Sequence, residues 1–73
     1  MKIIITGGSG LLGQYLNIFL SAKHDVLTFY NHNSGNCKQY KSLKIDLNDN
    51  AKLQNVLSDF KPDIVIHTAA YTN

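Results

Sequence analysis

Residues 1–16 read MKIIITGGSGLLGQYL, in which a short β-branched run leads into a glycine cluster and a helical apolar pattern follows at once. The run from Lys2 to Thr6 is apolar on both faces, as a central parallel strand is. Glycine-rich sequence then interrupts regular structure. The segment therefore predicts a strand over residues 2–6, a tight turn, and a helix over about 10–22.

The glycine spacing indicates what the turn holds. Gly7 can adopt the positive φ of a sharp turn, Gly10 lets a phosphate approach the backbone, and Gly13 lets the helix pack closely. The N–H groups of the first helical turn, near Leu11 and Leu12, lack helical partners and favour an anion. The spacing differs from the G-x-G-x-x-G of ordinary dehydrogenases. We expect a site for a dinucleotide diphosphate; the alternative is that the glycines only form a tight turn.

Composition narrows the class of protein. The 73 residues carry seven Lys against five Asp, for a net charge of +2. These charges are scattered along the chain without a run of one sign, so nothing in their pattern suggests nucleic acid as a partner. A single Cys cannot form an intramolecular disulfide, and the apolar run before the glycines is too short for a signal peptide or a membrane span. We expect a cytoplasmic protein and, given the length, the N-terminal portion of a single nucleotide-binding domain spanning residues 1–73.

The remaining pattern alternates strands and helices. The first helix is expected to pack on the sheet through one apolar face, and the second helix, capped by Asn48 or Asp49, through another. Strands are predicted over 26–30, 42–46 and 63–68, and a polar loop over 31–41. The expected core positions are Leu12, Tyr15, Leu16, Phe19 and Leu20 on the first helix and Leu53, Val56, Leu57 and Phe60 on the second.

This order predicts an α/β fold, the first half of a Rossmann-type parallel sheet with strand order 3-2-1-4. Ligands bind such sheets at the carboxyl ends of the strands, where the strand order reverses. The glycine segment and residues 68–73 both fall at that crevice.

The end of the second strand bears on cofactor choice. A site selective for NAD usually places Asp or Glu there, to bind the ribose hydroxyls of the adenosine. This chain offers Tyr30, Asn31, His32, Asn33 and Ser34, with Lys38 further on, and no acid. Amide, hydroxyl, imidazole and Lys donors can bind a 2′-phosphate, which a carboxylate would repel. We therefore expect NADP(H) to be favoured over NAD(H).

Two acids follow the third strand. Asp46, with Leu47 after it, lies where the adenine is expected and could accept from its amino group; the alternative is a turn residue. Asp49 is assigned to helix capping.

Other reactive side chains carry weaker arguments. Tyr40 and Lys44 have the Tyr-x-x-x-Lys spacing of short-chain reductases, but that pair acts from one helix face, whereas these residues straddle a loop and a strand. His67 is expected to be a core histidine. His32 and Cys37 alone do not make a metal site.

The chain resembles the extended short-chain dehydrogenase/reductase superfamily, through its glycine motif, through the segment from Asp46 to Asp49, and through residues 61–73, KPDIVIHTAAYTN. The last segment, ending in Ala-Ala-Tyr-Thr, is most similar to the dTDP-4-dehydrorhamnose reductase family. The resemblance implies an NAD(P)H-dependent reductase of a 4-keto sugar nucleotide, which makes a deoxysugar for cell-surface polysaccharide.

In that family the catalytic Tyr and Lys follow the fourth strand at some distance, so no catalytic residue is assigned here and the 73-residue chain is expected to be inactive alone. The resemblance places the counterparts of Ala69, Ala70 and Tyr71 along the cofactor near its reactive end. Tyr71 and Thr72, just beyond the fourth strand, are candidate contacts of the nicotinamide ribose or the substrate; the alternative is that they only form a loop. The expected cofactor contacts are Gly7, Gly10, Leu11, Leu12, Gly13, Asn31, His32, Ser34, Asp46, Leu47, Ala69, Ala70 and Tyr71.

Two other functions remain open. Some relatives, such as the regulatory β subunit of methionine adenosyltransferase, bind a dinucleotide to regulate a partner, and sugar-nucleotide epimerases share the same N-terminal half. The expected partners are thus a dinucleotide cofactor and, in the full-length protein, a sugar-nucleotide substrate. A homodimer is a possible assembly. We expect the protein to bind neither nucleic acid nor a membrane.

Overall fold

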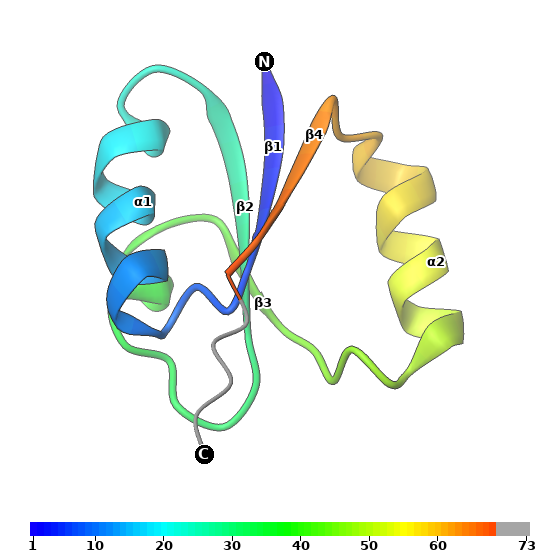
Figure 1. The fold of residues 1–73 in the computed structure, drawn as a ribbon. Helices are drawn as coiled ribbons and strands as arrows, with labels where there is room; N and C mark the ends of the chain where they lie inside the picture. Colours follow the sequence, from blue (N-terminus) through cyan, green and yellow to red (C-terminus); the bar gives the residue numbers. More distant parts are fainter. Residues whose placement is uncertain (69–73) are drawn as a thin grey trace.

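A computed structural model describes residues 1–68 of the chain. Its four strands form one parallel sheet in the order β3-β2-β1-β4, with α1 on one face and α2 on the other (Figure 1). The predicted fold and strand order are confirmed. The elements are β1 (Lys2–Thr6), α1 (Leu11–Ser21), β2 (Asp25–Tyr30), the 3-10 turn η1 (Cys37–Gln39), β3 (Ser42–Lys44), α2 (Asn50–Phe60) and β4 (Ile64–His67).

The two faces of the sheet carry separate cores because successive strand residues point to opposite sides. Ile4, Leu27, Phe29 and Ile45 form the core facing α2. Ile3, Ile5 and Val26 form the core facing α1. β1 is buried from Ile3 to Thr6, which confirms that it is a central strand.

α1 meets the sheet through only part of the predicted face, because Leu16 and Leu20 pack on it as expected and three other predicted residues do not. Gly13 and Asn17 are its buried residues, and Leu16 and Leu20 pack on the sheet. Leu12, Tyr15 and Phe19 are 58%, 59% and 56% exposed, so their assignment to the core is wrong. The rings of Tyr15 and Phe19 instead contact each other edge to face on the outer side, with centroids 4.7 Å apart. The physical reason is the close approach at Gly13, which turns the line from Gly13 to Leu20 inward.

α2 begins where the sequence predicts. Asp49 caps it, because its Oδ1 accepts from the backbone N–H of Lys52 at 3.1 Å. Leu53, Val56, Leu57 and Phe60 pack against the core as expected but remain partly exposed. A hollow of about 240 Å³ lies between this helix and the sheet.

Several smaller predictions change. Gly10 is the N-cap residue of α1, β3 ends at Lys44 rather than at 46, and the predicted loop over 31–41 contains the turn η1. His67 is exposed rather than buried in the core, and its Nδ1 pairs with the Thr6 hydroxyl. No helix within residues 1–68 has the length and apolar character needed to cross a membrane.

Candidate dinucleotide site

The glycine turn between β1 and α1 has the conformation that its spacing predicts. Gly7 has a φ of 67°, and its carbonyl accepts from the Gly10 N–H at 3.0 Å. A Cβ on Gly13 would stand 2.2 Å from that same carbonyl oxygen, so only glycine lets the helix start this close to the turn. A Cβ on Gly10 would meet nothing nearer than 3.4 Å. Gly13 therefore shapes the turn, whereas Gly10 leaves open space in front of it.

Gly8 is the glycine whose role the sequence did not reveal. Its N–H donates to the Phe29 carbonyl at 2.8 Å, which ties the turn to the end of β2. A Cβ at this position would lie 1.9 Å from the hydroxyl of buried Thr28 and 3.0 Å from the sulfur of Cys37. The underside of the turn is thus packed against β2 and η1.

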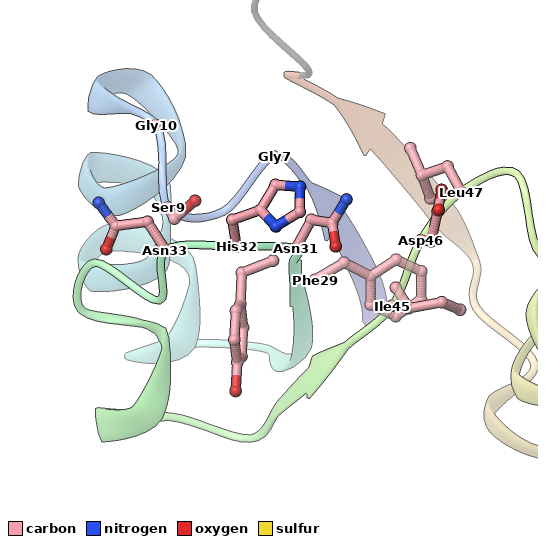
Figure 2. A pocket seen from close by; sticks show the side chains of 11 residues that line it. Gly7, Ser9, Gly10, Phe29, Asn31, His32, Asn33, Ile45, Asp46 and Leu47 are labelled. Carbon is pink, nitrogen blue, oxygen red and sulfur yellow. The ribbon is translucent and has the colours of Figure 1, made fainter.

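A cavity of about 650 Å³ opens beside this turn, at the carboxyl ends of the strands (Figure 2). We call it the loop cavity. One wall is the glycine turn, the second is the segment following β2, and the third is the segment following β3. Its lining residues are Gly7, Ser9, Gly10, Phe29, Tyr30, Asn31, His32, Asn33, Ile45, Asp46 and Leu47.

The loop cavity brings together six of the residues expected to contact a cofactor, namely Gly7, Gly10, Asn31, His32, Asp46 and Leu47. Leu11, Leu12, Gly13 and Ser34 do not line it. Leu11 and Leu12 stand at the start of α1 with exposed side chains, Gly13 is buried behind the turn, and the Ser34 carbonyl accepts from the Cys37 N–H. Ala69, Ala70 and Tyr71 lie outside the described residues, as does Thr72.

Three lining residues, Ser9, Phe29 and Ile45, were not expected from the sequence, whereas Tyr30 and Asn33 belong to the group after the second strand that the sequence offers to the cofactor. Phe29, Tyr30 and Ile45 stand at or just beyond the carboxyl ends of β2 and β3. The rule that ligands bind at those ends was a signal available in the sequence.

Charge is unevenly distributed around the loop cavity. Asp46 is the one carboxylate among its lining residues. Its Oδ1 accepts from the Asn48 N–H at 2.9 Å, and its carbonyl accepts from the Asp49 N–H. Asp46 is therefore both a turn residue and a cavity residue, and the two roles are compatible. On the wall after β2, Asn31, His32 and Asn33 present only amide and imidazole groups.

Other candidate groups lie apart. Tyr40 follows η1 and Lys44 ends β3, so the two do not share a helix face. Cys37 is buried under the glycine turn. Among residues 1–68, no three His, Cys, Asp or Glu side chains are grouped as a metal site would require.

The arrangement of turn, helix and cavity has counterparts in known proteins. A model of the family described as NAD dependent epimerase/dehydratase matches residues 3–73. The chain belongs to the NAD-dependent epimerase/dehydratase family. This membership confirms the resemblance to the extended short-chain dehydrogenases/reductases.

Relatives similar to this chain have names that refer to sugar nucleotides. A dTDP-D-glucose 4,6-dehydratase of Dictyostelium discoideum is 38% identical over 99% of this chain and 20% of its own length. A GDP-6-deoxy-D-talose 4-dehydrogenase of Aggregatibacter actinomycetemcomitans is 35% identical over 99% of this chain and 22% of its own length.

Solved structures of the family share the fold. A hypothetical dTDP-4-dehydrorhamnose reductase from Sulfolobus tokodaii has a TM-score of 0.85 and 36% identity, over 100% of this chain and 25% of that one. The Bordetella bronchiseptica enzyme WbmH, solved in complex with NAD+, has a TM-score of 0.77 and 26% identity, over 99% of this chain and 27% of that one. The chain thus spans about a quarter or less of these relatives.

Proposed function

We propose that residues 1–73 are the N-terminal portion of an NAD(P)H-dependent oxidoreductase that reduces a 4-keto-deoxysugar nucleotide, and that the loop cavity holds the adenosine half of the cofactor. The observation that carries the proposal is the cavity itself. A glycine turn, the end of β2 and the segment after β3 meet at the carboxyl edge of a parallel sheet, where nucleotides bind in such folds.

Each wall of the loop cavity has a part in this proposal. The diphosphate lies on the first turn of α1, whose free N–H groups and dipole favour an anion. The adenine lies against Leu47 and Ile45, with Asp46 accepting from its amino group. The ribose faces Asn31 and His32. The cofactor supplies the hydride; residues 1–68 bind and orient its adenosine end.

The wall after β2 leads us to propose NADPH as the preferred cofactor. Its amide and imidazole groups do not repel a 2′-phosphate, and the carboxylate of Asp46 stands on another wall. WbmH was solved with NAD+, so the preference of this protein has to be measured.

Fluorescence titration of the full-length protein with NADPH and NADH tests this preference. We expect tighter NADPH binding, and we expect Asn31→Asp to weaken NADPH about tenfold or more, since a carboxylate beside a 2′-phosphate is repulsive. Asn55→Asp is the matched control, because Asn55 is exposed on α2, away from the loop cavity. Tighter binding of NADH by the unmodified protein would contradict the preference.

A turnover assay tests the reaction. A reductase consumes one NADPH for each 4-keto-sugar nucleotide reduced, whereas a 4,6-dehydratase or an epimerase returns the hydride and consumes none. The names of the relatives make those redox-neutral reactions the second candidate. We expect net NADPH oxidation by the full-length protein and none by the 73-residue chain. Substrate conversion without NADPH loss would favour the second candidate, and binding without any conversion would favour a regulatory subunit.

A further inference from the structure

Asn17 is a buried polar residue in the middle of α1, with an exposed fraction of 0%. Its side-chain Nδ2 donates to the Gly8 carbonyl at 3.1 Å and to Asn36 Oδ1 at 2.9 Å, and the sulfur of Cys37 is a third, weaker acceptor at 3.7 Å. Its own oxygen, Oδ1, has no hydrogen-bond partner among the residues that the structure describes. A buried acceptor without a partner lowers the stability of the fold, so the favourable part of this residue's interactions is its donated hydrogen bonds.

The first bond acts on the glycine turn. The Gly8 N–H already donates to the Phe29 carbonyl at 2.8 Å, and Asn17 binds the carbonyl of the same residue. Gly8 is therefore held from β2 on one side and from α1 on the other. The position of the turn relative to the first turn of α1 depends on both.

The second bond acts on the segment after β2. Asn36 accepts from Asn17 and donates through Nδ2 to the Gln14 carbonyl at 3.1 Å. Gly35, with a φ of 51°, lies so close to the Gln14 side chain that a Cβ would be 2.8 Å from it. The Gln14 amide in turn donates to the Ser9 carbonyl at 2.8 Å. The segment is thus anchored on α1 and on the glycine turn.

These anchors bracket a wall of the loop cavity. The segment leaves the sheet at Tyr30 and reaches its anchor at Asn36, and the residues between include Asn31, His32 and Asn33, which line the cavity (Figure 2). Asn17 lines no part of the cavity. On the side away from the cavity, the amide of Asn17 links two of its walls. These are the glycine turn, proposed to bind the diphosphate, and the segment after β2, proposed to face the ribose.

We propose that Asn17 is a positioning residue for the cofactor, acting through Gly8 and Asn36 to set the spacing of these two walls and hence the discrimination between a 2′-phosphate and a 2′-hydroxyl. This inference rests on the function proposed above. It adds a residue to the site that touches no ligand.

The test compares NADPH and NADH affinities in the full-length protein. Asn17→Leu removes the donated bonds and puts an apolar side chain of similar size in their place. Asn36→Ala leaves the bond from Asn17 to Gly8 and removes both bonds of Asn36 to α1, the one from Asn17 and the one to the Gln14 carbonyl. Asn55→Leu is the matched control, since it makes the same chemical change on the exposed side of α2. We expect both test variants to change the ratio of the two dissociation constants by about fivefold or more, and the control to leave it unchanged.

The ratio separates positioning from general stability. A variant that only lowers the folded fraction weakens both cofactors by the same factor and leaves the ratio unchanged. Equal losses for both cofactors, or no loss, would overturn the inference while leaving the proposed function intact. An unmodified protein that binds neither cofactor would overturn both. Should Asn17→Leu fail to fold, Asn36→Ala decides, because Asn36 is only half-buried.

Discussion

Two glycines of the β1–α1 turn should respond to substitution in opposite ways. A Cβ on Gly13 would lie 2.2 Å from the Gly7 carbonyl oxygen and 2.7 Å from the Gly8 Cα, which are backbone atoms that cannot rotate away. Alanine in a helix interior gains about 1 kcal/mol over glycine, whereas overpacking of this kind costs about 1 to 3 kcal/mol. Because backbone atoms are in the way and the turn has to open by roughly 1 Å, we expect the upper part of this cost, about 2 to 3 kcal/mol. Less the gain of about 1 kcal/mol, Gly13→Ala should lower the free energy of unfolding by about 1 to 2 kcal/mol.

Gly10 offers the contrast. It is the N-cap residue, with φ −71° and ψ 172°, and the nearest atom to an added Cβ is 3.4 Å away. Serine fits this conformation and is at least as good an N-cap residue as glycine, so Gly10→Ser should keep or slightly raise stability. The new side chain would nevertheless occupy the space in front of the N–H groups proposed to bind the diphosphate. We expect its NADPH affinity to fall about tenfold or more.

Urea unfolding followed by circular dichroism measures the first effect in the full-length protein, and fluorescence titration with NADPH measures the second. A Gly13→Ala variant as stable as the unmodified protein would show that the close approach of turn and helix is not constrained. A Gly10→Ser variant that binds NADPH with unchanged affinity would show that the diphosphate does not lie on the start of α1.

Three further predictions concern the rest of the chain. Asp49→Ala should cost about 1 kcal/mol of unfolding free energy through loss of the α2 cap, and Asp59→Ala, on the same helix, should not; urea unfolding compares them. The hydrogen bond from Lys41, 2.8 Å long, lowers the pKa of the Asp25 carboxyl. The pair therefore stabilises the fold at any pH above the ordinary pKa of Asp, and this contribution is lost as the pH falls through the lowered pKa. Lys41→Met should make the melting temperature fall less steeply at low pH, and an unchanged pH profile would refute this prediction. The 73-residue chain alone should self-associate through β4, because the outer edge of this strand pairs with no other strand within residues 1–68. Sedimentation velocity should show more monomer for Val65→Lys, a change at an exposed position of β4, than for the unmodified chain. A monomeric unmodified chain would contradict this prediction.

Much of the fold could be predicted because its signals are local. Alternating strands and helices with right-handed crossovers leave few ways to order four parallel strands. Asp49 was identified as a cap from its place before an apolar periodic segment. The face of α1 could not be identified in this way. Apolar side chains occur on two sides of that helix, and composition does not say which side a glycine contact will turn inward.

The sequence by itself determined the positive φ at Gly7, the parallel order of the strands and the three segments that meet at their carboxyl ends, because each depends on neighbouring residues or on chain connectivity. Only the tertiary structure decided that Gly8 packs against Thr28 and that Asn17 binds Asn36, 19 positions away. Those contacts join segments from different elements, and their distances depend on how closely α1 approaches the sheet. The three segments that form the walls of the loop cavity follow from the sequence pattern, whereas the spacing of those walls follows from packing behind them.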